Sequence, residues 1–263
     1  LGDEKINTIY FGGGTPSLLS VDEIYHIINT VYKSYSVSND AEITLEANPD
    51  DFNKEKISYI KNNTPVNRLS IGVQSFFDDD LNYLNRIHDS KQAQSSIEAS
   101  INAGFENITI DLIYGIPTLS NKNWKENLRR FFEYKIPHLS SYSLTVEPKT
   151  ALHTLIKKNK IKNVVEKESV HHFEILLEEM QKNNFIHYEI SNFALEGYYS
   201  KHNSIYWLGG NYIGVGPSAH SYNGKSRQWN VSSIKSYCEQ DNFVNIIEEK
   251  EVLNQDQLFN EYV

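Results

Sequence analysis

The sequence is poor in cysteine, which forms the disulfides of secreted proteins, and in the basic residues that bind nucleic acid. One cysteine, Cys238, stands in 263 residues, which excludes an internal disulfide framework and fits a reducing, cytosolic setting. Acidic residues outnumber basic ones by 34 to 25, and the formal net charge of −9 argues against affinity built on phosphate neutralisation. No apolar run of about 18 residues is present, so we expect no transmembrane segment. No signal peptide is visible either.

Methionine is equally scarce. The only one is Met180, and the chain opens almost directly on a strand-like run. We therefore expect that part of the protein precedes Leu1. The 39% hydrophobic content in this length is enough for one large core or two smaller ones.

Short apolar runs alternate with amphipathic helical patterns through the first half of the chain. The runs predict strands at Ile6–Phe11, Glu42–Ala47, Arg68–Val73, Asn107–Leu112 and Leu139–Thr145. The helical patterns predict helices at Val21–Tyr35, Asn53–Asn62, Asp78–Asn85, Lys91–Ala103 and Asn123–Tyr134. This alternation predicts an α/β fold with a parallel sheet, which either stays open or closes into a full or partial barrel.

Polar residues follow five successive strands, which favours the barrel, because barrels collect their chemistry where strands end and loops begin. We predict a partial barrel over residues 1–150. Residues 151–168 are rich in lysine and asparagine and predict a solvated linker or an exposed helix face. A helix at Ser169–Asn183 then opens a smaller, aromatic-rich α+β domain over residues 169–263.

The glycine run Gly12–Gly14, with Thr15, follows the first strand. It can be a plain strand-to-helix turn. It lacks the spacing of a dinucleotide fold and the lysine of a phosphate loop. A bare backbone at a barrel rim also suits an amino-acid head group, because its carbonyls can receive an ammonium while its amides and the Thr15 hydroxyl receive a carboxylate.

Four further polar residues are candidates for the same rim. Glu46 ends a strand and can accept two hydroxyl hydrogen bonds, as from a ribose diol, or can cap the next helix. Gln74 also ends a strand, and Arg86 offers a fork of donors for a carboxylate or forms a surface ion pair. Asp111 lies in an apolar run, where a carboxylate is costly unless paired, which favours function.

Two histidine features carry no catalytic assignment. His88 has no visible partner, and we expect a structural role for it. No histidine pair at helical spacing has a third ligand in sight, so we predict no metal site within this chain.

Eight ordered motifs resemble the oxygen-independent coproporphyrinogen III oxidase-like radical-SAM proteins, most closely their HemW-type heme chaperone branch. The motifs run through nearly the whole chain and are specific jointly rather than singly. They are Thr8–Leu19, Glu46–Pro49, Arg68–Phe76, Arg86–His88, Ile110–Pro117, Leu144–Pro148, Tyr188–Phe193 and His202–Trp207.

The resemblance implies a partial (β/α) TIM-like barrel of the radical-SAM type, with S-adenosylmethionine (SAM) and a [4Fe–4S] cluster as cofactors. By matching motif, Gly13, Gly14 and Thr15 would hold the methionine part of SAM and Glu46 its ribose. Gln74, Arg86 and Asp111 would line the same cavity, and Thr145 matches a further SAM-lining position after a one-residue shift. The chemistry implied is reductive cleavage of SAM to a 5′-deoxyadenosyl radical.

The cluster ligands of this family are three cysteines in a loop upstream of the glycine motif, and this chain does not contain them. The resemblance therefore implies a barrel without its first strand. We expect this chain alone to be colourless and inactive, with weak residual SAM binding. The intact protein would bind heme as a chaperone or, alternatively, decarboxylate propionates in porphyrin biosynthesis. Implied partners are heme or a porphyrinogen, an electron donor and a heme-accepting protein, in the cytoplasm.

Overall fold

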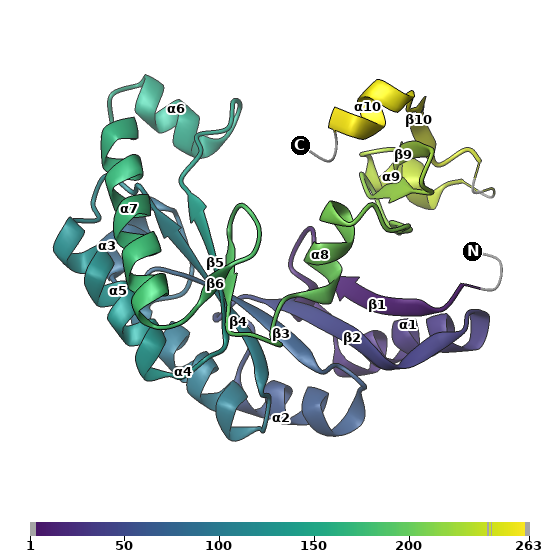
Figure 1. Ribbon diagram of the computed structural model, residues 1–263, viewed down its shortest axis with the longest axis horizontal. Helices are drawn as coiled ribbons and strands as arrows, with labels where there is room; N and C mark the ends of the chain where they lie inside the picture. The colour runs from purple at the N-terminus through teal and green to yellow at the C-terminus, as the bar shows by residue number, and fades with distance from the viewer. Residues whose placement is uncertain (1–3, 241, 243, 261–263) are drawn as a thin grey trace. The chain divides into compact units, whose positions relative to one another are not determined.

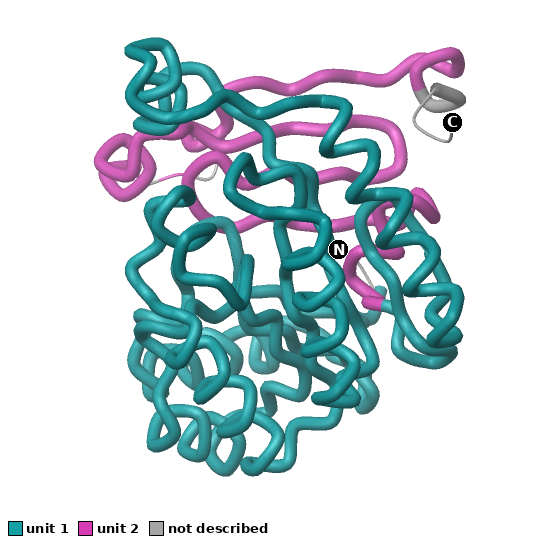
Figure 2. Tube along the Cα trace, turned by 90° about the vertical axis from the view of Figure 1, so that its left-hand side faces the viewer, with its two compact units in different colours: residues 1–199 teal, residues 200–263 magenta. Residues whose placement is uncertain are grey.

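The computed structural model describes residues 4–240, 242 and 244–260, which divide into two compact units, Leu1–Tyr199 and Ser200–Val263 (Figure 2). Helices α6 (Ala151–Lys157) and α7 (Glu166–Lys182) belong to the first unit. The division predicted from sequence, into a barrel over residues 1–150, a linker over 151–168 and a second domain over 169–263, remains a prediction. Among the described residues no helix is long and apolar enough to cross a membrane.

The first unit is built on a seven-stranded sheet in the order β1-β2-β3-β4-β5-β7-β6. The five long strands run parallel and in sequence order, and a short antiparallel tail closes the series. The strands are β1 (Ile6–Phe11), β2 (Val37–Ala47), β3 (Arg68–Gln74), β4 (Asn107–Tyr114), β5 (His138–Ser143), β6 (Ile186–His187) and β7 (Asn192–Ala194). The predicted partial barrel is confirmed, and the sheet is visibly curved (Figure 1).

Helices cross over between the parallel strands and lie on the convex side of the sheet (Figure 1). In chain order they are η1 (Pro16–Leu18), α1 (Val21–Ser34), α2 (Lys54–Asn63), α3 (Asp78–Tyr83), α4 (Ser90–Asn102) and α5 (Asn121–Glu133). Local sequence defines their ends. Ser20 and Glu23 form the capping box that starts α1, and Gly104, with a φ of +86°, follows the end of α4.

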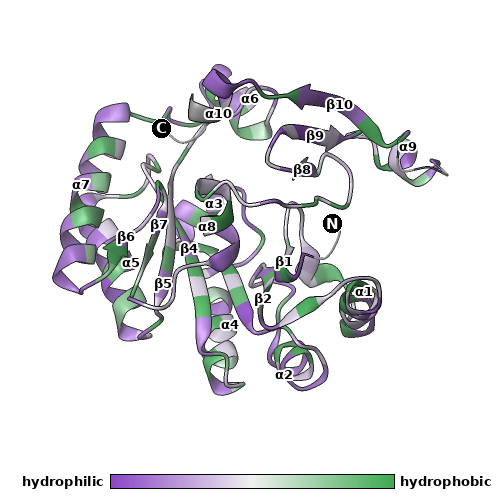
Figure 3. Ribbon diagram, turned by 45° about the vertical axis from the view of Figure 1, so that its right-hand side comes forward, coloured by the Kyte–Doolittle hydropathy of each residue, from purple (hydrophilic) through white to green (hydrophobic). Residues whose placement is uncertain are grey.

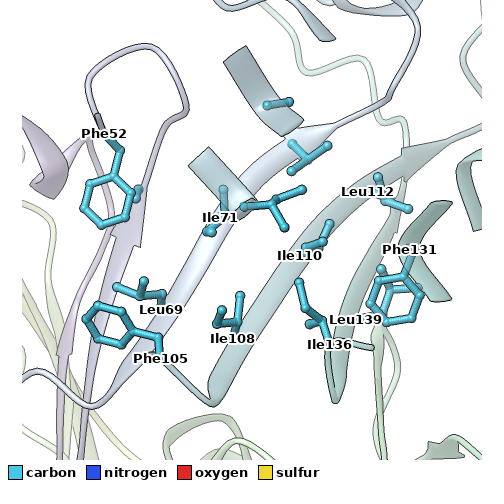
Figure 4. Close-up of a cluster of buried hydrophobic side chains, with 14 of the residues drawn as sticks. Phe52, Leu69, Ile71, Phe105, Ile108, Ile110, Leu112, Phe131, Ile136 and Leu139 are labelled. Carbon is cyan, nitrogen blue, oxygen red and sulfur yellow. The ribbon is translucent and has the colours of Figure 1, made fainter. Parts of the chain in front are cut away.

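The core lies between the sheet and these helices. Successive side chains of a strand point to opposite faces, so every second residue of β2 to β5 meets the helices. Most of those residues are aliphatic and fully buried, and aromatic side chains such as Phe52, Phe105 and Phe131 complete the cluster (Figure 4). The fully buried ones include Leu45, Leu69, Ile71, Ile108, Ile110, Leu112 and Leu139. The helices that cover this face are amphipathic, and polar and apolar bands alternate along their length (Figure 3).

The second unit holds a three-stranded antiparallel sheet in the order β10-β9-β8. Its elements are α8 (Lys201–Trp207), β8 (His220–Tyr222), β9 (Ser226–Asn230), α9 (Ile234–Cys238), β10 (Ile247–Val252) and α10 (Gln255–Asn260). The late motif His202–Trp207 coincides with α8, where His202 Nε2 lies 3.1 Å from the Tyr206 hydroxyl, one helical turn away.

Candidate functional site

The inner face of the curved sheet is polar, in contrast to the face that meets the helices. The alternate residues of β2 to β5 that do not enter the core include Thr44, Glu46, Arg68, Ser70, Thr109, Asp111, His138 and Ser140. Strand register places these side chains in neighbouring rows, with Glu46 opposite Ser70 and Asp111 opposite Ser140. Closed barrels fill their interior with branched aliphatic side chains, so this polar face is suited to a polar ligand.

Near the amino-terminal ends of β3, β4 and β5, this face contains a buried chain of hydrogen bonds. The Arg68 guanidinium donates to the Thr109 hydroxyl, which lies 3.0 Å from His138 Nδ1, and His138 Nε2 lies 2.8 Å from the Tyr188 hydroxyl. Arg68, Thr109 and His138 are fully buried. Burial, assisted by the charge of Arg68, lowers the pKa of His138 well below its usual value. His138 is therefore neutral at pH 7 and lies in this chain of hydrogen bonds together with Arg68.

Two carboxylates, Glu46 on β2 and Asp111 on β4, lie on the same face and are called the Glu46–Asp111 row below. Glu46 accepts a 2.7 Å hydrogen bond from the Tyr10 hydroxyl, and Asp111 accepts one of 3.1 Å from Ser70. The pKa of Asp111 is raised to about 7, chiefly by burial and also by the charge of Glu46, while Ser70 and Arg68 oppose the shift. The raised pKa favours a protonated Asp111 compared with an ordinary aspartate.

Two tyrosines, one on β1 and one on β5, lie near this row. Tyr142 on β5 is 45% exposed, yet burial of its hydroxyl raises its pKa to about 12, with Asp111 adding to the shift. The pKa of Tyr10 on β1 is also raised, first by burial and then by Glu46. Both hydroxyls are thus protonated donors around the two carboxylates.

The glycine loop after β1 leaves its backbone open. Gly13 has a φ of +80°, which favours glycine, and no atom lies within 4 Å of a Cβ built on Gly13 or Gly14. Gly12 is different, because a Cβ there would stand 2.8 Å from Glu46 Oε1. The loop therefore allows close approach of a ligand at Gly13 and Gly14 and allows Glu46 to pack against it at Gly12.

The loop ends of β1, β2 and β3 meet in a second cluster. The Asn48 amide bridges Thr15 and Arg86, since Asn48 Nδ2 lies 3.4 Å from Thr15 Oγ1 and Arg86 Nη2 donates to Asn48 Oδ1 over 2.7 Å. Burial lowers the pKa of Arg86, and Asp50 and Asp111 oppose that shift. No ion pair of Arg86 with Asp89 or Glu98, the alternative considered from sequence, is formed among the described residues.

Gln74 stands in an uncommon backbone conformation. Its φ is +66°, and the Ser75 amide donates to the Val73 carbonyl over 2.8 Å, which is the pattern of a γ-turn. Gly72 makes room for this turn, because a Cβ there would lie 2.9 Å from Gln74 Nε2 and 3.4 Å from both Arg86 Nη2 and Asn48 Oδ1.

A buried network supports the turn from below. Asp80 accepts hydrogen bonds of 2.7 Å from Ser75 and 2.6 Å from Thr118, and Asn127 Oδ1 receives the amide of Phe76 over 2.9 Å. Burial raises the pKa of Asp80. The network joins the turn after β3 to the loop after β4 and to α5, so the strained conformation of Gln74 is fixed by its surroundings.

The predicted site residues are thus brought together in most cases. Thr15, Gln74 and Arg86 meet around Asn48 and Gly72, and Gly12 and Gly13 lead to Glu46 and Asp111. Thr145 is the exception, because it is exposed and its hydroxyl donates to the nearby Ser143 carbonyl, over 3.4 Å. Asp111, placed at a strand end from sequence, lies three residues inside β4.

His88 has a structural environment, as expected. It is 2% exposed, its Nε2 lies 3.1 Å from the Val73 carbonyl, and burial lowers its pKa.

Sequence reasoning gave no role to Tyr10, Ser70 or Tyr142, which surround the two carboxylates. Their signal was available in the period-two alternation of polar residues along the strands.

Known proteins match this chain over most of its length. The Radical SAM superfamily matches residues 1–131. The heme chaperone HemW of Bacillus subtilis is 38% identical over 239 residues, covering 90% of this chain and 63% of that protein. The heme chaperone HemW of Lactococcus lactis is 37% identical over 234 residues, covering 89% and 62%.

Among solved structures, the coproporphyrinogen III oxidase HemN of Escherichia coli matches with a TM-score of 0.81 and 21% identity, covering 98% of this chain and 62% of that chain. This likeness shows the fold. The chain spans about 63% of the length of the first of these curated relatives. Over about nine tenths of its length the chain is thus similar to radical-SAM proteins named heme chaperone HemW.

Proposed function

We propose that this chain forms the SAM-binding part of a heme-handling protein of the HemW type. The observation that carries the proposal is the joint placement of the open glycine backbone, the Thr15–Asn48–Arg86 cluster and the Glu46–Asp111 row on one polar sheet face. Radical-SAM relatives over 89–90% of the chain are named heme chaperones. Bound SAM, with a reduced cluster, would supply one-electron chemistry.

The donor set fits SAM group by group. Gly13 and Gly14 expose carbonyls and amides to an amino-acid head group, and Thr15 adds a hydroxyl. Glu46 can accept from two ribose hydroxyls, and the two carboxylates attract the sulfonium charge. Arg86 and Gln74 present donors at the same edge, and the raised pKa of Asp111 allows its carboxyl group to donate as well as accept there. Thr145 remains a candidate from the resemblance alone.

The cluster does not fit the residues of this chain. The family uses three cysteines, and this chain has Cys238 alone, which is exposed in the second unit. No group of three or more histidine, cysteine, aspartate or glutamate side chains gathers for a metal in the part of the chain that the structure describes. The cluster is therefore assigned to the full-length protein, and the residues here are assigned only to SAM.

The remaining assignments follow from this function. A heme or porphyrin ligand, an electron donor and a heme-accepting protein are its partners. A single exposed cysteine supports placement of the protein in a reducing cytoplasm.

The test uses the full-length protein with reconstituted cluster. Stoichiometric heme uptake without conversion of coproporphyrinogen III is the expected result, and turnover of coproporphyrinogen III would replace this function with the oxidase. Calorimetric titration of the 263-residue chain with SAM tests the site itself. We expect weak SAM binding by the wild-type chain and loss of that binding in Glu46→Gln and in Arg86→Ala. Wild-type affinity in both variants would refute the assignment.

A further inference from the structure

The hydrogen bonds below the Gln74 turn have a direction that the backbone fixes. The Phe76 amide can only donate, and it donates to Asn127 Oδ1 over 2.9 Å. The other end of the Asn127 amide is therefore its NH2 group, which donates to the Ser75 hydroxyl over 3.1 Å. The Ser75 hydroxyl has a single proton, which it donates to Asp80 Oδ2 over 2.7 Å. We call the side chains of Ser75, Asp80 and Asn127 the turn network.

The turn network is buried and satisfied at both ends. Asp80 Oδ1 accepts from the Thr118 hydroxyl over 2.6 Å, and Ser75 Oγ also accepts from the Phe77 amide over 3.3 Å. The three side chains of the turn network are at most 1% exposed, and each of their nitrogen and oxygen atoms has a partner. Such a network holds one geometry, because a rotation within it leaves a buried donor or acceptor unpaired.

Asn127 is an unusual residue for its place in α5. It lies on the buried face of the helix together with Trp124, Leu128 and Phe131, which are fully buried. A buried amide is costly unless it is hydrogen-bonded, whereas an apolar side chain would extend the core. The Asn127 side chain bonds the chain 51 and 52 positions earlier, at residues 76 and 75. Packing of α5 therefore does not account for this residue, whereas bracing of the turn does.

The turn network acts on the residue that begins the turn. Gln74 has a φ of +66°, which persists in a residue other than glycine only where the surroundings hold it. The turn network holds the next two residues, through the Ser75 side chain and the Phe76 amide. Gln74 Nε2 shares the space over Gly72 with Arg86 Nη2, since a Cβ on Gly72 would lie 2.9 Å and 3.4 Å from these atoms. The turn network is thus connected to the candidate site through one residue.

We propose that Asp80 and Asn127 are positioning residues for the SAM site, which act through Ser75 to hold the Gln74 amide in place. The proposal rests on the proposed function, because that function assigns Gln74 to SAM. Asp80 and Asn127 act through a neighbour, so what matters is the continuity of the hydrogen bonds and not their direction. A change that reverses every bond of the turn network should therefore preserve SAM binding.

The test swaps the two side chains. Asn127→Asp alone places two carboxylates beside the single proton of Ser75 and buries a second acid. Adding Asp80→Asn reverses the network. The amide at position 80 then donates to Ser75, and Ser75 donates to the carboxylate at position 127, which still accepts from the Phe76 amide. Ser75→Ala breaks the network at its centre and serves as the second variant if Asn127→Asp does not fold.

Two measurements are made on each variant. Hydrogen exchange followed by mass spectrometry on the 263-residue chain reports the amides of residues 75–77 without any ligand. Calorimetric titration of the full-length protein with SAM gives the affinity. Ser100→Ala is the matched control, because it removes an equally buried hydroxyl, which donates to the Ser96 carbonyl over 2.8 Å within α4.

Asn127→Asp and Ser75→Ala should exchange faster at residues 75–77 and bind SAM about ten-fold more weakly, with less than about a two-fold change in Ser100→Ala. The swapped double variant should return to within about three-fold of the wild-type SAM affinity and recover the slow exchange. An affinity in the double variant as low as in Asn127→Asp, or wild-type affinity in Ser75→Ala, would overturn the proposal. Absence of SAM binding by the wild-type protein would remove the proposed function and the SAM part of this proposal, whereas the exchange rates would still show whether the network holds the turn.

Discussion

Replacing Asp111 by asparagine should stabilise the protein at neutral and alkaline pH while weakening SAM binding. Burial raises the pKa of Asp111 from 3.8 to about 7. One pKa unit corresponds to about 1.4 kcal/mol, so the ionised side chain costs up to about 4 kcal/mol of folding free energy. The side chain keeps some solvent contact, which reduces the cost to about 2–4 kcal/mol.

The pH dependence has a defined sign. Between about pH 4 and pH 7 the folded protein keeps a proton on Asp111 that the unfolded chain releases, so this residue's contribution to stability falls as pH rises and becomes constant above about pH 7. Asparagine does not titrate. The advantage of Asp111→Asn should therefore grow by about 1.4 kcal/mol per pH unit up to pH 7.

Urea denaturation of wild type and Asp111→Asn at a series of pH values measures this difference, and common contributions of the other acids cancel in the comparison. Ser70→Ala is the matched variant, because it removes the hydroxyl that bonds Asp111 at 3.1 Å and should raise the pKa of Asp111 further. A pH-independent difference between wild type and Asp111→Asn would refute the raised pKa. Unchanged SAM affinity in Asp111→Asn would refute its place in the site.

Three further predictions concern other parts of the molecule. Gly115→Ala should lower the free energy of unfolding by about 2–5 kcal/mol in urea denaturation, because φ is +75° and the new Cβ would overlap Ser169 Oγ. The control is Gly104→Ala, at a φ of +86° with no atom nearer than 3.9 Å, which should lose about 1–2 kcal/mol. Equal losses in the two variants would contradict the overlap. Gly72→Ala should lower SAM affinity about ten-fold by displacing the Gln74 amide, with stability unchanged or slightly raised, and a parallel loss of stability would instead indicate general misfolding. The 263-residue chain should show no iron–sulfur absorbance band after cluster reconstitution, and such a band would overturn the assignment of the cluster to other residues.

The parallel sheet and its helices were predictable from sequence because each element carries its own signal. The capping box at Ser20 and Glu23 and the glycine after α4 defined helix ends locally. The start of β2 was missed by five residues, since Val37–Asp40 combines polar, largely exposed positions with an irregular register against β1. Strands β6 and β7, with two and three residues, are too short to show a period.

The candidate site was predictable only in part, for a physical reason. Residues at loop ends, such as Thr15 and Arg86, were found because a polar residue after a strand is visible in one dimension. Tyr10 and Ser70 were missed because their roles come from the register between strands, which places Tyr10 beside Glu46 and Ser70 beside Asp111. A sequence pattern reports which face a residue shares, and pairing across strands depends on the whole sheet.

The alternation along the strands separates stability from function in this fold. Leu69 and Ile71 pack in the core, whereas Ser70 between them serves the polar face, and Ile110 and Asp111 repeat this division on β4. Truncation of a core residue should therefore destabilise the barrel by about 2–5 kcal/mol, while replacement of Asp111 by asparagine should cause little loss or even a gain. The raised pKa of Asp111 indicates that keeping a carboxylate on that face costs the fold stability. A face that served only packing would have no reason to retain it, which is the strongest physical argument that this face binds a charged ligand.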